Sequence, residues 1–299
     1  MVDKPAGCTS HDVVAACRRI FGQRRVGHAG TLDPDATGVL LVGLGAVTRL
    51  LRFVGQGPKS YTAEVVLGTA TDTLDAGGKV TGTWDMAGVS LDDVRRAAAG
   101  FVGEITQLPP MVSAVKVGGR RLHELARQGR EVERAPRPVT VWHLDVGPGP
   151  EPGVVAVEVT CSAGTYVRSL AADLGTALGG GAHLRRLRRT AVGAFGIDEA
   201  VPLEAVGPRA VRTPAEAVGH LPRVAVAGER ARAVGHGAVL ERGDLGVAEL
   251  GAGEDGGPWA VVDDRGRLLA VYEPHRDGRV KPAVVVPGER GGPAPAPSA

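Results

Sequence analysis

Residues 27–38 of this chain read GHAGTLDPDATG. The three glycines permit another molecule to approach the backbone closely, and Pro34 disfavours a helical conformation at Asp33. The segments on the C-terminal side, 39–42 and 47–54, are apolar enough to be buried. The sequence therefore predicts a glycine-rich loop that holds the Asp33 carboxylate between packed elements.

Elements on either side of this loop have clear sequence signals. Thr9 with Asp12, and Ser90 with Asp93, have the spacing of capping boxes, which predicts helices running to about residues 21 and 99. Residues 59–68 alternate between apolar and polar side chains, the pattern of a half-buried strand.

The second half of the chain adds further strands and helices. We expect a strand over 112–117 that turns at Gly118-Gly119 into a short helix over 122–128, paired strands over 139–146 and 154–161, a helix over about 166–178 and a basic strand over 183–192. Because these elements lack the regular rhythm of βαβ repeats, the predicted fold class is α+β, with a mixed, largely antiparallel sheet flanked by helices.

The predicted domain organisation has three parts. Residues 1–208 form the main domain. Turn-forming residues become more frequent over 208–222, which marks a boundary. Residues 222–286 contain short β-rich runs that fit a small β-barrel-like module. Residues 287–299 are a Gly/Pro/Ala tail that cannot bury apolar surface, and we expect it to be disordered.

Composition excludes several classes of protein. The longest apolar runs are too short to span a membrane, and the first twenty residues include His11, Asp12, Arg18 and Arg19 rather than a signal-peptide core, so we expect a cytoplasmic protein. The three cysteines have irregular spacing and no C-x-x-C pair, which argues against a disulfide framework and a structural metal.

The net charge is only +2, but the basic residues are clustered. Such clusters can neutralise phosphates of a nucleic acid, or they can form an ordinary solvated face. They comprise Arg18, Arg19, Arg24 and Arg25; Lys116, Arg120 and Arg121; Arg127, Arg130 and Arg134; and Arg185, Arg186, Arg188 and Arg189.

Five segments, in this order, resemble motifs of the TruB family of tRNA pseudouridine synthases, which also includes guide-RNA-dependent archaeal and eukaryotic enzymes. They read DKPxGxTS at 3–10, GHxGTLDPxAxG at 27–38, KxY at 59–61, LGxxTDTxDAxG at 67–78 and CSxGTYVRSL at 161–170. The resemblance extends along nearly the whole chain and is closest to the bacterial stand-alone type. Where relatives have several more residues before the first motif, this chain starts at Met1-Val2, which leaves open whether the start is truncated.

The resemblance implies a fold and an activity. The fold would be that of pseudouridine synthases, with a PUA-like C-terminal module. The activity would be isomerisation of the T-loop uridine at position 55 of tRNA to pseudouridine, with the tRNA T-arm as partner and no cofactor. From the residues themselves we expect no metal, and a monomer is the default because the sequence does not fix the oligomeric state.

Residue roles follow from the same resemblance. Asp33 would be the nucleophile or the catalyst of glycosidic bond cleavage, Tyr61 would pack on the target base, and Arg168 would pair with Asp33. Leu187 would line the pocket, and His28 would fill the gap left by the extruded nucleotide.

Two further groups of residues would support the site or bind the substrate. Lys4, in the first motif, would support the pocket without taking part in bond making. The stretch 109–138 resembles the family's RNA-gripping insertion, with phosphate contacts expected from Lys116, Arg121, Arg127 and Arg130.

The chemistry itself needs an ionised carboxylate. Moving uracil from an N1 to a C5 linkage exchanges no electrons overall, so no redox cofactor is required. A carboxylate can attack C1′ of the sugar, attack C6 of the ring or remove a 2′ proton, and the sequence does not choose among these routes. A guanidinium such as that of Arg168 would keep Asp33 ionised in a desolvated pocket.

Other interpretations stay open at this point. Tyr61 also fits a core strand tyrosine, His28 a loop histidine and Arg168 a surface arginine, while Asp72 and Asp75 fit turn carboxylates. A noncatalytic RNA-binding protein would need only the basic clusters and the C-terminal module. A base deaminase needs a zinc motif that this chain lacks, and a nucleoside hydrolase needs paired carboxylates.

Overall fold

The computed structural model describes residues 1–113, 116–117, 120–121, 132–247 and 256–287. The chain divides into two compact units, each of which is described by itself. The first comprises Met1–Val13, Gly30–Leu40 and Gly55–Ala205, and the second comprises Val14–Ala29, Leu41–Val54 and Val206–Ala299.

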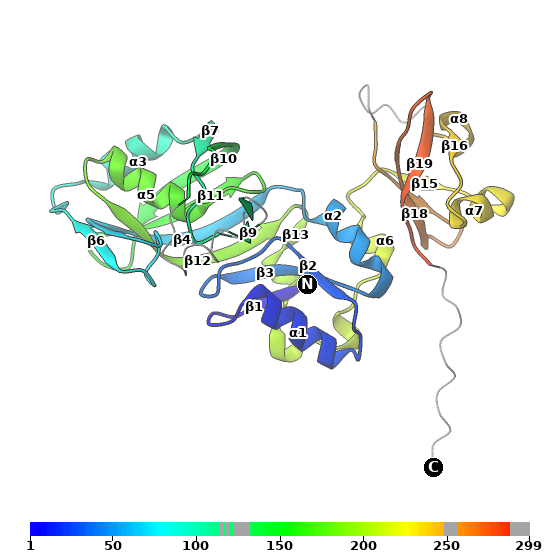
Figure 1. The fold of residues 1–299 in the computed structure, drawn as a ribbon, viewed down its shortest axis with the longest axis horizontal. Coiled ribbons are helices and arrows are strands. Elements are labelled where there is room, and N and C mark those ends of the chain that lie inside the picture. Colours follow the sequence, from blue (N-terminus) through cyan, green and yellow to red (C-terminus); the bar gives the residue numbers. More distant parts are fainter. Residues whose placement is uncertain (114–115, 118–119, 122–131, 248–255, 288–299) are drawn as a thin grey trace, which may run out of the picture. The chain divides into compact units, whose positions relative to one another are not determined.

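A large mixed sheet is the centre of the first unit (Figure 1). Its strands follow the order β14 (Val201–Pro202), β1 (Val2–Lys4), β3 (Thr37–Leu44), β12 (Ala182–Val192), β4 (Lys59–Leu67), β11 (Val154–Cys161), β10 (Arg137–Pro148) and β7 (Gly103–Gln107). Along this path β1–β14 and β3–β12 are parallel and the other pairs are antiparallel. The predicted mixed, largely antiparallel sheet is confirmed.

Further short strands pair within each unit. In the first unit, β13 (Phe195–Gly196) pairs with β12, and β5 (Thr69–Thr71) forms a hairpin with β6 (Val80–Thr83). In the second unit, β2 (Val26–Ala29) pairs with Leu41–Leu44 of β3. The 3₁₀ turns η2 (Ile197–Glu199) and η3 (Leu203–Ala205) lie on either side of β14 along the chain.

Helices pack on the sheet at positions that the capping signals predict. α3 (Leu91–Ala99) begins after a complete Ser90/Asp93 capping box. It packs on β10 and against α5 (Val167–Ala177), which in turn packs on β12, and the two helices lie side by side in Figure 1. α1 (Ser10–Ile20) begins at the Thr9/Asp12 capping box, in which each residue accepts a hydrogen bond from the other's backbone N–H.

β4 is the strand that the alternating pattern predicts. It is paired on both edges, with β11 and β12. Its side chains at Tyr61, Ala63 and Val65 are buried in the main core together with Leu170 and Leu174 of α5. This face of the strand is therefore covered by α5, and Tyr61 lies at one end of it.

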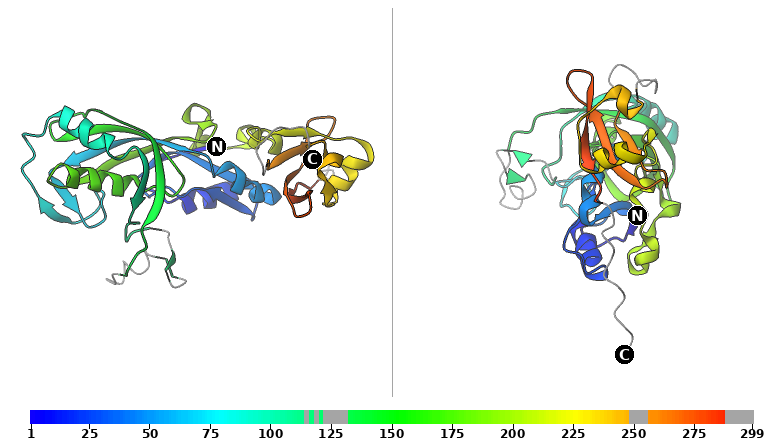
Figure 2. Two further views of the ribbon diagram at one scale, coloured as in Figure 1. Left: turned by 90° about the horizontal axis from the view of Figure 1, so that it is seen from above. Right: turned by 90° about the vertical axis from the view of Figure 1, so that its right-hand side faces the viewer.

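The insertion between β7 and β10 is only partly described. β8 (Lys116–Val117) and β9 (Arg120–Arg121) form a two-stranded hairpin that stands away from the sheet (Figure 2). The predicted strand over 112–117 is too long. Val112 and Ser113 form bends, and the Val112 carbonyl accepts a hydrogen bond from Arg168 of α5. The predicted helix over 122–128 lies outside the described residues.

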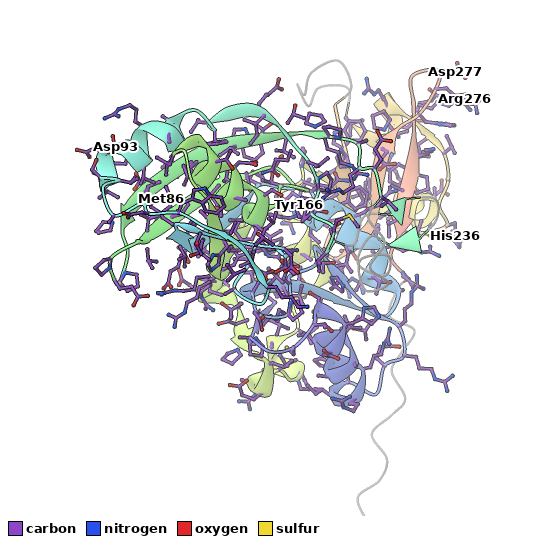
Figure 3. The ribbon with its side chains drawn as sticks, turned by 60° about the vertical axis from the view of Figure 1, so that its left-hand side comes forward. Met86, Asp93, Tyr166, His236, Arg276 and Asp277 are labelled. Atoms are coloured by element: carbon purple, nitrogen blue, oxygen red, sulfur yellow. The ribbon has the colours of Figure 1, made fainter. Side chains whose placement is uncertain are left out.

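The C-terminal part of the second unit is a curled five-stranded sheet. Its order is β15 (Arg223–Ala225), β17 (Trp259–Val262), β18 (Leu268–Pro274), β19 (Arg279–Val285) and β16 (Leu240–Glu241). Trp259 and Tyr272 are buried in its core with residues of α7 (Gly228–Gly235) and α8 (Arg242–Leu245). Figure 3 labels His236 at the end of α7 and the Arg276–Asp277 turn between β18 and β19.

The remaining elements of the second unit come from two stretches of sequence. η1 (Gly45–Leu50) and α2 (Leu51–Val54) follow β3, and η4 (Pro208–Ala210) and α6 (Pro214–Ala217) precede β15. The sequence predicted buried segments at 39–42 and 47–54. The first is part of β3 and the second is helical.

Three general findings accompany the fold. Across the described ranges no helix is both long and apolar enough to cross a membrane. Cys8, Cys17 and Cys161 are free thiols. Within those same ranges no cluster of three or more His, Cys, Asp or Glu side chains is arranged to hold a metal ion.

We predict that Gly38→Ala destabilises the first unit. Gly38 has φ +103°, and a Cβ there would lie 2.1 Å from the Arg189 carbonyl oxygen, a backbone atom that cannot move without breaking the β3–β12 pairing. Strain of this kind costs about 1–3 kcal/mol, so Tm should fall by roughly 5 °C or more. Gly147→Ala is the control, because no atom lies within 4 Å of its Cβ position and its φ is not positive. Equal Tm values for the two variants would contradict this prediction.

Candidate active site

The loop between β2 and β3 holds Asp33 through contacts on both of its sides. On the N-terminal side, the Ser10 hydroxyl donates to the Leu32 carbonyl (3.1 Å) and accepts from the Leu32 N–H (2.9 Å). On the C-terminal side, the Lys4 ammonium donates to the Pro34 carbonyl (2.8 Å). The backbone at Asp33 is therefore fixed before any substrate arrives.

Lys4 is fully buried and uses its remaining hydrogen bonds within the first motif. It donates to the carbonyls of Pro5 (2.8 Å) and Cys8 (2.6 Å). Burial lowers the pKa of Lys4, while the neighbouring Cys8, Asp35 and Asp33 oppose this shift. Lys4 therefore connects the segment after β1 to the loop that carries Asp33, and its contacts are those of a residue that supports the loop.

Arg168 lies at the start of α5 and meets Asp33 with two nitrogens. Its Nε lies 2.9 Å from Asp33 Oδ2 and its Nη2 donates to Asp33 Oδ1 (3.2 Å). The guanidinium is 4% exposed, whereas the Asp33 side chain is 42% exposed. A two-point contact of this kind fixes the orientation of the carboxylate and leaves it accessible from the other side.

The same guanidinium contacts a second carboxylate and two carbonyls. Its Nη1 donates to Asp75 Oδ2 (3.3 Å) and to the Thr73 carbonyl (3.0 Å), and its Nη2 donates to the Val112 carbonyl (2.8 Å). Asp75 also accepts hydrogen bonds from the Thr73 hydroxyl and the Gly77 N–H, as a turn carboxylate does. Among the described residues, the Asp72 carboxylate accepts a hydrogen bond from the Lys79 N–H alone. Of the two carboxylates that sequence reasoning assigned to turns, Asp75 therefore belongs to the site as well.

Electrostatics at Asp33 are balanced between opposing causes. Burial raises the pKa of the Asp33 carboxyl above its ordinary value, and the guanidinium of Arg168 works against this rise. The negative charge of Asp75 raises the pKa further, and Lys4 lowers it. The net direction of the pKa shift is upward, so this carboxyl takes up a proton more readily than an exposed aspartate.

Tyr61 lies close to Asp33 and is mostly buried. It is opposite Arg189 across the β4–β12 pairing and packs in the same core cluster as Leu32 and Leu187. Burial raises the pKa of Tyr61, so the phenol stays protonated, although Arg189 opposes this. Leu187 is half-buried in β12 opposite Ala63. Two side chains expected to line a base pocket thus belong to one apolar cluster beside the carboxylate.

Arg189 is a site residue that sequence reasoning placed only in a basic cluster. Its side chain is 1% exposed, and it donates from Nε to the Val39 carbonyl (2.8 Å) and from Nη2 to the Gly30 carbonyl (2.9 Å). It therefore anchors the loop that carries Asp33. The sequence signal that this arginine points inward is that Leu187 and Ala191, two residues to either side, where a regular strand places side chains on the same face, are apolar.

The other predicted residues lie in other elements of the chain. His28 is half-buried in β2, opposite Val42. Lys116 and Arg121 are paired in the β8–β9 hairpin. Arg127 and Arg130 lie outside the described residues.

Gln107 and Tyr166 connect the start of the insertion to α5. The Gln107 carboxamide donates to the Tyr166 carbonyl (3.2 Å) and accepts from its N–H (2.9 Å). Tyr166, labelled in Figure 3, precedes the first residue of α5. Together with the Arg168–Val112 contact, this fixes the base of the insertion next to the two carboxylates.

Two family models match the chain. Residues 18–167 match the TruB family pseudouridylate synthase N-terminal domain, and residues 168–221 match the tRNA pseudouridylate synthase B C-terminal domain. Among curated proteins, tRNA pseudouridine synthase B of Mycobacterium sp. (strain KMS) is 46% identical over 92% of this chain and 95% of the relative. The protein of the same name from Symbiobacterium thermophilum is 51% identical over 78% and 80%.

Solved structures give the same result. The chain in the crystal structure of a Cbf5-Nop10-Gar1 complex is 28% identical and superposes with a TM-score of 0.67, covering 96% of this chain and 83% of that one. A chain in an H/ACA RNP bound to a substrate RNA containing 2′-deoxyuridine gives a TM-score of 0.68 at 26% identity, covering 95% and 83%. With its motifs, its sheet and these matches, the chain belongs to the TruB family of pseudouridylate synthases.

Proposed function

We propose that this enzyme converts the T-loop uridine at position 55 of tRNA to pseudouridine, with Asp33 as the essential carboxylate and without a cofactor. The observation that carries the proposal is the Asp33–Arg168 pair, in which the cation is buried and the carboxylate is partly open. The tRNA pseudouridine synthases B among its relatives support tRNA as the substrate.

The contacts suggest a role for each side chain at the site. The target nucleotide leaves its stack at a cost of a few kcal/mol, and stacking on Tyr61 returns about 1–3 kcal/mol. Asp33 then acts on C1′, on C6 or on the 2′ proton, and Arg168 keeps it ionised and aimed. Leu187 lines the base pocket, and His28 fills the gap in the RNA.

RNA binding is assigned to basic residues outside this pocket. Lys116, Arg121, Arg127 and Arg130 of the insertion contact phosphates, and residues 222–286 form a second RNA-binding module after a catalytic domain spanning 1–208. The enzyme acts as a monomer on the T-arm in the cytoplasm and uses no metal. Mass-spectrometric mapping of modified uridines after incubation with total tRNA tests the substrate and the position.

A noncatalytic RNA-binding protein is the alternative function. It would be favoured by RNA affinity without product in a carbodiimide-based pseudouridine assay on a T-arm transcript. Burying a guanidinium against an accessible carboxylate carries a large desolvation penalty and contributes nothing to phosphate binding. This arrangement therefore favours an enzyme over a noncatalytic RNA-binding protein.

We predict that Asp33→Asn abolishes turnover and changes tRNA affinity by no more than a few fold. An amide cannot supply the ionised oxygen, whereas affinity comes from phosphate contacts elsewhere. Single-turnover assays and filter binding measure the two quantities. Asp72→Asn is the matched control, since Asp72 is exposed and, among the described residues, its carboxylate accepts a hydrogen bond from the Lys79 N–H alone. A normal rate for Asp33→Asn would refute the catalytic assignment.

For Arg168→Ala we expect kcat to fall by roughly 10²–10³-fold, the size of losing one preorganised charge contact. Substrate affinity should change much less, because the partners of Arg168 are carboxylates and backbone carbonyls. Arg168→Lys retains the charge without the two-point contact, so its kcat should lie between those of the wild-type protein and Arg168→Ala. A loss confined to KM would place Arg168 in RNA binding.

The pH dependence should reveal the coupling of the two carboxylates. Since the pKa of Asp33 is raised, the single-turnover rate should fall with decreasing pH at a midpoint above the ordinary aspartate value of about 3.9. Asp75→Asn removes one cause of the rise, so its midpoint should move to lower pH, even though its plateau rate falls. Asp72→Asn should leave the midpoint in place. An unchanged or higher midpoint in Asp75→Asn would be inconsistent with this coupling.

A further inference from the structure

Two buried basic side chains meet at Gly30 in the catalytic loop. Lys59 is the first residue of β4 and is 8% exposed, and Arg189 of β12 is 1% exposed. A Cβ on Gly30 would lie 3.5 Å from Lys59 Nζ and 3.3 Å from Arg189 Nη1. Both cationic groups therefore lie against the loop, three residues before Asp33.

In the part of the chain that the structure describes, neither cation forms an ion pair with a carboxylate. Arg189 donates to two neutral carbonyls, those of Val39 and Gly30. For Lys59, neither a side-chain hydrogen bond nor an ion pair to any residue in the described parts of the chain is present. The two carboxylates of the site, Asp33 and Asp75, are bound by Arg168. This part of the site thus carries positive charge in excess.

An ammonium removed from water without a counterion is costly, and lysines are rarely buried unless they are paired. Burial and the charge of Arg189 both lower the pKa of Lys59. An anion placed against Lys59 would oppose both effects, because its charge stabilises the protonated ammonium. A substrate that carries such an anion would supply the missing counterion.

The position of Lys59 indicates which anion this is. Lys59 and Tyr61 are two residues apart on one face of β4, so both point to the same side of the sheet. A uridine stacked on Tyr61 with its sugar at Asp33 brings its own phosphodiesters to the margin of the pocket. The base is neutral, while every linkage of the RNA carries a negative charge.

We propose that Lys59, backed by Arg189, binds a phosphodiester oxygen adjacent to the target uridine and so positions the sugar at Asp33. This inference rests on the proposed function. It makes Lys59 a residue that binds the extruded nucleotide itself, in contrast to the insertion, which contacts the rest of the T-arm. Lys59 is two residues before the tyrosine in the KxY motif, to which no role was assigned from the sequence.

The test combines protein variants with uncharged RNA linkages. T-arm hairpins are made with a single methylphosphonate at each phosphate around the target uridine in turn. Affinity and single-turnover rate are measured with the wild-type protein, Lys59→Met and Lys59→Arg. Lys79→Met is the control, because Lys79 is exposed beside β6 and far along the chain from the catalytic loop.

We expect one linkage adjacent to the target uridine to weaken wild-type binding or rate by about tenfold or more, as expected for a charged hydrogen bond. Lys59→Met should show that same loss on the unmodified hairpin and no further loss at that linkage. Lys59→Arg should retain most of the discrimination, and Lys79→Met should behave as the wild type.

Two results would overturn the proposal. In the first, the loss caused by Lys59→Met and the loss caused by the methylphosphonate are additive at every linkage. That result would mean that Lys59 only supports the loop. The other is a wild-type protein insensitive to every flanking methylphosphonate, a result that does not depend on how any variant folds. Failure of the proposed function is distinct, because it appears as absence of pseudouridine with wild-type protein on the unmodified hairpin.

Discussion

The contact on which this structure depends is the buried guanidinium of Arg168 held between two carboxylates. A cation that is 4% exposed needs compensation in the protein, and Asp33 and Asp75 supply it. Because those carboxylates come from the loop before β3 and from the turn after β5, the ion pairs hold both segments against the start of α5. The charge that stabilises this junction also orients the Asp33 carboxylate, which we propose as the catalytic group.

Backbone anchoring makes that orientation rigid. The loop around Asp33 is held by Ser10 at Leu32, by Lys4 at Pro34 and by Arg189 at Gly30. Each anchor is a buried polar side chain that satisfies main-chain groups, as a loop near the core requires. Fixing the loop in this way removes much of the ordering that the reaction would otherwise need when RNA binds. Asp33 itself keeps an accessible face, so rigidity does not close the site.

Local sequence signals predicted most of the architecture, and the failures have identifiable causes. β4, α3 and the β10–β11 pair agree with alternation or capping, which are short-range properties. The strand expected over 112–117 is interrupted because the Val112 carbonyl accepts a hydrogen bond from Arg168, a partner 56 residues away. β19 lies within the β-rich stretch expected over 222–286, but Lys281 and Pro282 interrupt its apolar pattern, and the neighbouring strand β18 supplies its pairing.

The sequence by itself determined that Asp33 lies in a glycine-rich loop, that Tyr61 is on the buried face of a strand, and that the ordered motifs match one enzyme family. These are properties of residue type and spacing, which a chain carries before it folds. Beyond the Arg168–Asp33 pair that the resemblance implied, only the tertiary structure decided which charges meet. That Arg168 binds Asp75 as well as Asp33, that Arg189 turns inward, and that Lys59 is left without a counterion depend on pairing between distant strands, because electrostatic partners are chosen by proximity in space and not along the chain.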